Sequence, residues 1–284
     1  MKLSGLNTIV TGGSQGFGRH IVEAFLAEGA NVVFCARTKA DVTKAGADLK
    51  AKLKPGQRLI GVACDISKPA DVKTLFAQAK KLGPLHVVVN NAGIYGPIGP
   101  TEEVSLADWT QAWSVNATGT LLVCQHAVRA MKPRGAGKII NISGGGATNP
   151  MPRLAAYAAT KAAVVRLTET LAEEYRADHI DVNAVAPGAL HTRFTEQVLA
   201  AGPEKAGPDF FAKNKKWAEG GGADPKLGAA LCVFLASPES NGITGRLISA
   251  QWDPWKEPAK FRALANGDVY TLRRIVPEDR ARKS

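Results

Sequence analysis

The feature that most constrains the fold is a regular alternation of short apolar runs with longer helical stretches. The runs are rich in β-branched residues, and most are apolar throughout, which is typical of parallel strands buried on both faces. They occupy residues 8–10, 32–35, 59–63, 86–90, 138–142, 181–185 and 246–249. The helical stretches cover residues 19–28, 39–53, 70–82, 105–131, 155–177 and 225–236. We therefore expect an α/β fold with a doubly wound parallel sheet of about seven strands, helices on both faces and right-handed crossovers.

Two segments interrupt this alternation and define the expected domain organisation. The chain has 284 residues with no sequence repeat or low-complexity linker, so we expect a single domain over residues 1–251. Residues 192–223 are rich in glycine and proline and predict a mobile lid. Residues 252–284 follow the last strand as a C-terminal extension. Its aromatic residues could either close a pocket or pack on a neighbouring subunit.

Composition excludes several classes of protein. Hydrophobic residues make up 45% and charged residues 21%, which excludes a wholly disordered or fibrous chain. No apolar run approaches the ~20 residues of a membrane span, and the N-terminus does not have the pattern of a signal peptide, so we expect a cytoplasmic protein. The formal net charge is +11, but the basic residues are spread out and not interleaved with aromatics. This favours attraction of small anionic ligands over nucleic-acid binding.

Cysteine and histidine spacing gives no indication of a metal site. The four cysteines (Cys35, Cys64, Cys124 and Cys232) contain no CxxC pair, and the five histidines are scattered. We expect reduced, buried and inert thiols and no bound metal.

A glycine-rich loop directly follows the first predicted strand and precedes the first predicted helix. Its sequence from Thr11 to Gly18 is TGGSQGFG, with the spacing Gly-x-x-x-Gly-x-Gly. Glycines allow a sharp turn and a close approach of backbone N–H groups to a pyrophosphate, and the helix N-terminus favours negative charge. Because the loop lies at the first strand-to-helix crossing, we interpret it as a dinucleotide-binding loop rather than an ordinary turn.

Three further motifs follow in order: Asn90-Asn91-Ala92-Gly93, Tyr157-x-x-x-Lys161 and Pro187-Gly188-x-x-x-Thr192. With the glycine loop they resemble the short-chain dehydrogenase/reductase family over residues 5 to about 250. The resemblance implies a Rossmann fold and a nicotinamide cofactor. The residues expected to bind the cofactor are Gly12, Ser14, Gln15, Gly16, Phe17, Gly18, Arg37, Thr38, Asp65, Ile66, Asn91, Ala92, Gly93, Tyr157, Lys161, Pro187, Gly188, Leu190 and Thr192.

The end of the second strand bears on the choice of cofactor. An acidic residue there would bind the ribose 2′-hydroxyl of NAD and repel a 2′-phosphate, but Ala36 and Arg37 occupy this position. The Arg37 guanidinium can form charge-assisted bonds to a phosphate, which favours NADP(H) over NAD(H). Alternatively, Arg37 stacks on the adenine. By the resemblance, Asp65 bonds the adenine amine with Ile66 beside it, and residues 91–93 line the adenosine ribose.

Tyr157 and Lys161 are the expected proton-transfer pair. Positions i and i+4 of one helix lie on the same face, one turn apart. A neighbouring ammonium is expected to lower the phenol pKa from about 10, so that Tyr157 can give a proton to a carbonyl oxygen or accept one from an alcohol. By the resemblance, Lys161 also holds the nicotinamide ribose, and the Leu190 backbone and Thr192 hydroxyl meet the carboxamide. Asn116 matches the family's asparagine, expected to hold a water linking Lys161 to solvent; a satisfied core amide is the alternative.

One position departs from the family pattern. The family usually carries a serine thirteen residues before its tyrosine, and here that position is Gly144, with Ser143 one residue earlier. A slip of one residue along a strand turns a side chain to the opposite face, so Ser143 can serve as the catalytic serine only if the following glycines bend the strand end. Otherwise backbone N–H groups of the glycine run, Thr148 or Asn149 supply the donor.

The resemblance implies an NAD(P)-dependent enzyme acting on CH–OH groups, which transfers a hydride between NADP(H) and a ketone or secondary alcohol. Both a 3-oxoacyl-thioester reductase and a sugar or cyclic-alcohol dehydrogenase are open, and Arg153 or Arg193 could meet an acidic substrate group or face solvent. The alternative is a cofactor-binding scaffold or sensor with weak or no turnover, supported by Gly144; DNA binding ranks third. The helices 105–131 and 155–177 resemble the family's subunit interface, which implies a homodimer or homotetramer.

Overall fold

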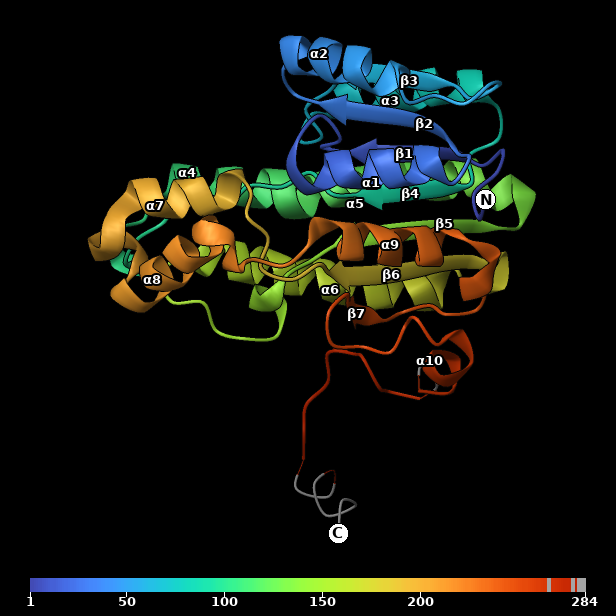
Figure 1. Cartoon of the computed structure of the whole chain (residues 1–284). Coiled ribbons are helices and arrows are strands. Elements are labelled where there is room, and N and C mark those ends of the chain that lie inside the picture. Colours follow the sequence, from blue (N-terminus) through green and yellow to red (C-terminus); the bar gives the residue numbers. More distant parts are fainter. Residues whose placement is uncertain (265–266, 277–278, 280–284) are drawn as a thin grey trace.

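The computed structural model describes residues 1–264, 267–276 and 279, and its centre is a parallel sheet of seven strands (Figure 1). The order across the sheet is β3-β2-β1-β4-β5-β6-β7. The strands are β1 (Asn7–Thr11), β2 (Asn31–Ala36), β3 (Leu59–Ala63), β4 (Val87–Asn90), β5 (Gly137–Ile142), β6 (Ile180–Ala186) and β7 (Leu247–Ser249). This confirms the expected doubly wound fold. The order reverses between β1 and β4, and ligands of such sheets bind at the carboxyl ends of the strands beside this point.

Burial explains the apolar character of the strands. All five residues of β1 and all four of β4 are buried, because helices cover both faces of the sheet. β1 pairs in register with both neighbours, with Ile9 opposite Val33 of β2 and Val88 of β4. The edge strand β3 is more exposed. The predicted strands are therefore correct in type and within one or two residues at each end.

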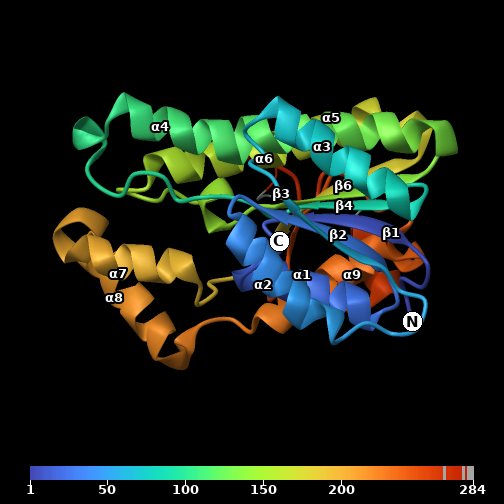
Figure 2. The same cartoon turned by 90° about the horizontal axis from the view of Figure 1, so that it is seen from above.

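Two helical layers sandwich the sheet (Figure 2). One layer contains α1 (Gly16–Ala27), α2 (Lys39–Lys50) and α9 (Pro225–Ala236). The other contains α3 (Pro69–Ala79), α4 (Leu106–Trp113), α5 (Thr120–Met131) and α6 (Ala155–Glu174). Each layer forms its own apolar core against one face of the sheet, with Phe25 and Phe34 in the first core and Leu75 and Ile139 in the second.

The predicted helix 105–131 begins as expected but is interrupted. The Ser105 hydroxyl accepts a hydrogen bond from the Asp108 N–H at 3.1 Å and caps α4. Between α4 and α5 lies a π-helical segment, Ser114–Gly119. Such widened turns occur mostly where function requires a local change in side-chain direction. This one carries the buried Asn116.

The segment predicted as a lid contains helices that its glycines and prolines did not indicate. These are α7 (Arg193–Ala206), which is kinked at Gly202, and α8 (Pro208–Lys216), followed by a π-helical turn over Trp217–Gly221. Both helices project beyond the carboxyl ends of the strands (Figures 1 and 2). The position suits a lid, and its mobility stays a prediction.

The C-terminal extension packs on the chain's own core. Trp255 and Phe261, the latter in α10 (Pro258–Leu264), are buried against Phe234 of α9. The Leu247 N–H of β7 donates to the Tyr270 carbonyl at 2.8 Å, so the extension also covers the edge of the sheet. Trp255 and Phe261 therefore belong to the chain's own core, whereas the exposed Trp252 lies at the rim of the site. Residues 265–266, 277–278 and 280–284 of the extension lie outside the described residues.

The four cysteines are free and buried, as expected. Within the described ranges, no helix combines the length and apolarity that a membrane crossing requires.

Candidate active site

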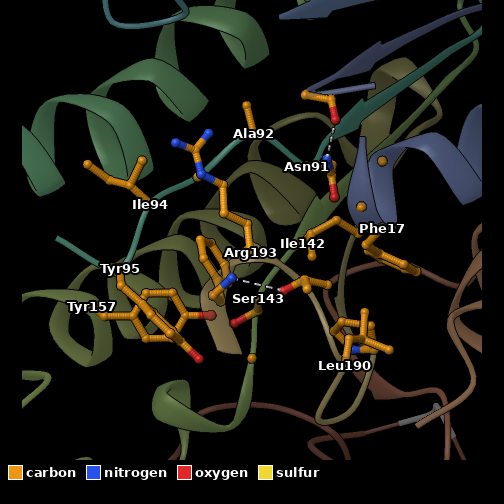
Figure 3. Close-up of a pocket in the computed structure, with 18 of the residues that line it drawn as sticks. Phe17, Asn91, Ala92, Ile94, Tyr95, Ile142, Ser143, Tyr157, Leu190 and Arg193 are labelled. Carbon is orange, nitrogen blue, oxygen red and sulfur yellow. Dashed lines mark hydrogen bonds between the residues drawn. The ribbon is translucent and has the colours of Figure 1, made fainter. Parts of the chain in front are cut away.

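A single cavity of about 1020 Å³ runs along the carboxyl ends of the strands and across the point where strand order reverses. Every residue predicted to bind the cofactor lines it, including Tyr157 and Lys161, and so does Ser143. Figure 3 shows Tyr157 and Ser143 on its wall. Asn116 lies behind the cavity wall rather than in it. Folding therefore brings together side chains that are up to 180 positions apart in the sequence, as the motifs predicted.

The glycine loop forms one end of this cavity, and its geometry explains its glycines. Gly12 and Gly16 have φ values of +66° and +53°, in the left-handed region that favours glycine. A Cβ atom on Gly18 would lie 2.1 Å from the Gly12 carbonyl oxygen and 2.3 Å from Nδ2 of Asn91. The third glycine therefore lets α1 approach the loop, as the motif predicted.

Hydrogen bonds from the last residue of β1 and from the segment after β4 hold the loop in place. The Asn91 side-chain amide donates to the carbonyls of Thr11 at 3.0 Å and Gly12 at 3.2 Å. The Thr11 hydroxyl accepts from the N–H groups of Asn91 at 3.0 Å and Ala92 at 3.1 Å. Thr11 is a positioning residue that the sequence analysis did not single out, although its hydroxyl immediately before the glycines was a usable signal.

The adenosine side of the cavity contains Arg37 and Asp65. Arg37 is exposed and, in the part of the chain that the structure describes, forms no hydrogen bond or ion pair. Oδ1 of Asp65 accepts from the N–H of Ser67 at 3.0 Å and its hydroxyl at 2.7 Å, which fixes the carboxylate at the end of β3. A guanidinium without a partner at this place fits an anionic group on the ligand.

Tyr157 and Lys161 lie one turn apart on α6 at the other end of the cavity. The Lys161 ammonium donates to the Ile142 carbonyl at 2.8 Å and lies 5.7 Å from the centre of the Tyr157 ring. Both side chains are buried, with 8% of Tyr157 and 5% of Lys161 exposed. The predicted juxtaposition is present, and β5 holds the lysine through its last carbonyl.

The electrostatics of this pair differ from the expectation. Burial raises the pKa of Tyr157, with a smaller contribution in the same direction from Tyr95. Burial also lowers the pKa of Lys161 to about 8. The expected lowering of the phenol pKa by Lys161 is not found, because burial disfavours the charged phenolate and Tyr95 acts in the same direction. In this state the site holds a neutral phenol, which is a proton donor.

Asn116 uses its side chain to join two walls of the site. Its Oδ1 accepts from the Ile94 N–H at 2.9 Å, and its Nδ2 donates to the Ile94 carbonyl at 2.8 Å and the Thr160 hydroxyl at 3.0 Å. A Cβ on Gly93 would meet Asn116 Oδ1 at 3.2 Å and Lys161 Nζ at 3.6 Å, so this amide lies close to the lysine. The bonds to Ile94 and Thr160 are those of a satisfied amide, while the predicted water relay stays a prediction.

Ser143 and Gly144 face different surroundings. The buried Ser143 hydroxyl donates to the Lys161 carbonyl at 3.4 Å. A Cβ on Gly144, by contrast, would lie 3.0 Å from Oη of Tyr157. Thr148 and Asn149, the other candidate donors, are exposed and bonded to each other at 3.1 Å. Position 144 is therefore the one beside the reactive hydroxyl, while Ser143 as catalytic serine stays a prediction.

Two aromatic residues, from the predicted pocket wall 94–100 and from the start of the predicted lid, contact Tyr157, a contact that the sequence did not indicate. Tyr95 meets the Tyr157 ring edge-on at 4.7 Å between centroids (Figure 3), and it stacks on Phe194 at 4.3 Å. Phe194 belongs to the first turn of α7, so the predicted lid contacts Tyr157 directly. Arg193 lines the cavity and, among the described residues, has no polar partner, whereas Arg153 donates to the Glu204 carbonyl at 2.7 Å.

The cavity meets the requirements of a dinucleotide site. The backbone of the loop forms a cradle at Gly12 and Gly16, which have left-handed conformations, and at Gly18, where a Cβ would clash. Larger residues at these positions would obstruct the approach of a phosphate to the backbone N–H groups. The volume is at the upper end of the usual range for ligand pockets. Among the described residues no group of three or more metal-ligating side chains is found.

Known proteins are similar to this chain in sequence and in fold. The short chain dehydrogenase family matches residues 7–202. Gluconate 5-dehydrogenase of Gluconobacter oxydans is 32% identical over 248 residues, covering 87% of this chain and 93% of that protein. A 3-beta-hydroxysteroid dehydrogenase of Comamonas testosteroni is 35% identical over 254 residues, covering 88% and 95%. The crystal structure of levodione reductase superimposes with a TM-score of 0.79 at 25% identity, covering 87% of this chain and 96% of that one.

Proposed function

This chain belongs to the short-chain dehydrogenase/reductase family, and on that premise we propose that it transfers a hydride between NADP(H) and a ketone or secondary alcohol. The observation that carries the proposal is the placement of Tyr157 and Lys161 in the same cavity as the glycine cradle. NADPH, when bound, supplies the hydride and is oxidised as the ketone is reduced.

Tyr157 acts in this proposal as the proton donor for reduction. Its buried phenol is neutral near pH 7, because burial raises its pKa. As charge develops on the substrate oxygen, the Tyr157 hydroxyl donates a hydrogen bond and then its proton. Lys161, held 2.8 Å from the Ile142 carbonyl, stabilises the phenolate that results. Asn116 keeps α6 and the segment around Ile94 in register, so it supports the pair from behind.

The rest of the cavity suits the cofactor proposed for it. The glycine loop, including Ser14, Gln15 and Phe17, receives the pyrophosphate, and Asp65 with Ile66 receives the adenine. Residues 91–93 line the ribose, while Pro187, Gly188, Leu190 and Thr192 surround the nicotinamide carboxamide.

NADP(H) is favoured over NAD(H) because Arg37 is exposed and without a partner in the described chain, and Thr38 lies beside it. Comparing dissociation constants for NADPH and NADH tests this preference. Equal or tighter binding of NADH contradicts it, and Arg37→Ala should weaken NADPH binding selectively.

The substrate proposed is a secondary alcohol or the matching ketone. The relatives include enzymes named for gluconate, a polyhydroxy acid, and for a 3-beta-hydroxysteroid, an apolar alcohol. Arg193 at the cavity, without a polar partner among the described residues, suits an anionic or polyhydroxylated substrate better than a steroid. We favour the polyhydroxylated class, in the direction of reduction at neutral pH.

The decisive test is Tyr157→Phe. Loss of a general acid costs about 10² to 10⁴ in turnover, so reduction should fall by that factor while NADPH binding is kept. Turnover of ketones by this variant at the wild-type rate would contradict the proposal. Tight NADPH binding with no turnover of any carbonyl by the wild type would instead favour the scaffold or sensor.

Assembly and location complete the proposal. We propose a homodimer or homotetramer that associates through α4, α5 and α6. Light scattering tests this directly, and a monomer contradicts it.

We also propose that the protein works in the cytoplasm, where free thiols such as its four buried cysteines stay reduced.

A further inference from the structure

Gly144 is the residue from which this inference starts, because its glycine is not required by the backbone. Its φ is 177° and its ψ is 175°, an extended conformation that any residue adopts. The three atoms nearest to a Cβ placed there all belong to Tyr157, with Oη at 3.0 Å, Cζ at 3.9 Å and Cε1 at 4.0 Å. The glycine therefore leaves a small space beside the Tyr157 hydroxyl, which a Cβ would enter only if that hydroxyl shifted by a few tenths of an ångström.

The neighbouring hydroxyl does not fill this space. Successive side chains at the end of a strand point to opposite sides. Ser143 accordingly donates to the Lys161 carbonyl on α6 at 3.4 Å, and its own N–H donates to the Val185 carbonyl of β6 at 2.8 Å. Asn149, farther along the same loop, donates through Nδ2 to the Thr148 hydroxyl at 3.1 Å and to the Gly145 carbonyl at 3.3 Å. The Ser143 hydroxyl and the Asn149 amide are thus engaged elsewhere, and the exposed Thr148 is not among the atoms nearest to a Cβ at position 144.

Reduction of a ketone places negative charge on the oxygen, and each well-placed donor to that charge is worth about 10²–10³ in rate. Tyr157 supplies one donor. We infer that the substrate supplies the second from a hydroxyl group on the carbon next to the reacting carbonyl, lodged in the space beside Gly144. The preferred substrates are then α-hydroxyketones and, in the reverse direction, vicinal diols.

Such a hydroxyl is positioned by the substrate's own bonds, so little entropy is lost in bringing it to the oxygen. It forms and breaks no covalent bond. It donates a hydrogen bond to the carbonyl oxygen while the carbon accepts the hydride and the oxygen takes the proton of Tyr157. This inference rests on the proposed function and narrows its substrate class.

Three matched ketones test it with NADPH: 2-hydroxycyclohexanone, 2-methoxycyclohexanone, which has an oxygen but no donor, and cyclohexanone. The wild type should reduce the hydroxyketone with a kcat/KM about 10² times that of either other ketone. A ratio within about threefold overturns the inference, because one donor of this kind should be worth far more. This comparison needs no variant and is independent of folding.

Two variants of one position provide the matched control. Gly144→Ser adds a protein donor and should raise kcat/KM for cyclohexanone by about tenfold or more. The ratio of kcat/KM for 2-hydroxycyclohexanone to that for cyclohexanone should therefore fall. Gly144→Ala fills the same space without a donor, so it should lower the hydroxyketone rate by about tenfold and leave cyclohexanone less affected. Unchanged NADPH affinity and melting temperature show that both variants are folded. A ratio unchanged in Gly144→Ser also overturns the inference.

The outcomes separate this inference from the proposed function. Comparable turnover of all three ketones leaves the oxidoreductase function standing and removes only the role of the substrate hydroxyl. If the wild type reduces none of them and oxidises neither cyclohexanol nor cyclohexane-1,2-diol, while binding NADPH, both proposals fail.

Discussion

Two glycine-rich turns leave the carboxyl edge of the same sheet, one after β1 and one after β5, and they use glycine for different reasons. In the first, Gly12 and Gly16 have positive φ, and Gly18 has no room for a Cβ. In the second, Gly144 is extended and faces only Tyr157, and a Cβ on Gly145 would have nothing within 4 Å. The comparison teaches that a glycine cluster can reflect a steric requirement or an opening left for a ligand.

The bracing of the two turns differs in the same way. Asn91 and Thr11 hold the first through four hydrogen bonds of 3.0–3.2 Å. The second is held through its flanks, where Ile142 accepts from Lys161 and Asn149 bonds back to Gly145 at 3.3 Å. The first turn is therefore held directly by side chains of neighbouring segments, while the second lies beside the Tyr157 hydroxyl.

Gly18→Ala should have the largest effect on the first turn. Its Cβ would lie 2.1 Å from a backbone oxygen, which cannot move without displacing the loop. We expect NADPH affinity to fall by about 10²-fold and the free energy of unfolding to fall by about 1–3 kcal/mol. Fluorescence titration with NADPH and urea unfolding measure the two effects, and affinity within about threefold of wild type contradicts the steric account.

The pH dependence of reduction tests the role of Lys161, which is bonded to the residue just before the second turn. Lys161, bonded to the residue before Ser143, has a pKa lowered to about 8 by burial, so it is charged below pH 8 and loses its charge as the pH rises through that value. Its charge stabilises the phenolate formed when Tyr157 gives up its proton. We therefore expect kcat/KM for reduction to be constant below pH 8 and to fall by up to about tenfold per unit above it.

A control for this profile is Lys161→Arg, which stays charged throughout the range. Whatever its absolute rate, its profile should be flat where that of the wild type declines. A decline at the same pH in both proteins would assign the titration to another group.

Gly146→Ala should have an intermediate effect, because its Cβ would meet a flexible side chain first. The nearest atom is Sδ of Met151 at 2.8 Å, followed by Cα of Ala158 at 3.1 Å. Movement of the methionine relieves most of the contact, so we expect a loss of about 1 kcal/mol in the free energy of unfolding. Equilibrium urea unfolding checks this, and a loss as large as that of Gly18→Ala would remove the distinction between the turns.

Gly145→Ala should have the smallest effect and serves as the matched control for both substitutions. With no positive φ and open space around the new Cβ, it should change the free energy of unfolding by less than about 0.5 kcal/mol and leave NADPH affinity unchanged. A large loss of stability here would mean that the second turn also requires its glycines for folding.

Much of the fold and of the site could be predicted from local patterns. The strands were found because residues buried on both faces must be apolar, as in β1 and β4. The glycine loop and the Tyr157–Lys161 pair were found because their spacing within one loop or one helix already determines their relative position. The helices α7 and α8 were missed because glycine and proline lie within and between them, at Gly202 and Gly207.

Contacts between distant segments could not be found in this way. Tyr95 and Phe194 are 99 positions apart, yet their rings stack on each other at 4.3 Å and both meet the Tyr157 ring edge-on. Burial of Tyr157, which the sequence did not reveal, raises its pKa. Trp255 and Phe261 of the extension joined the core through Phe234. Neither result has a signature in the local sequence.

By itself the sequence determined the alternating α/β architecture, the glycine-rich loop after β1 and the pairing of Tyr157 with Lys161, because each depends on backbone geometry over a few neighbouring residues. Only the tertiary structure decided that position 144 rather than Ser143 faces the Tyr157 hydroxyl, and that burial raises the pKa of Tyr157. Those outcomes depend on how β5, α6 and α7 pack together, since desolvation and side-chain direction are set by the surroundings of a residue and not by its neighbours in the chain.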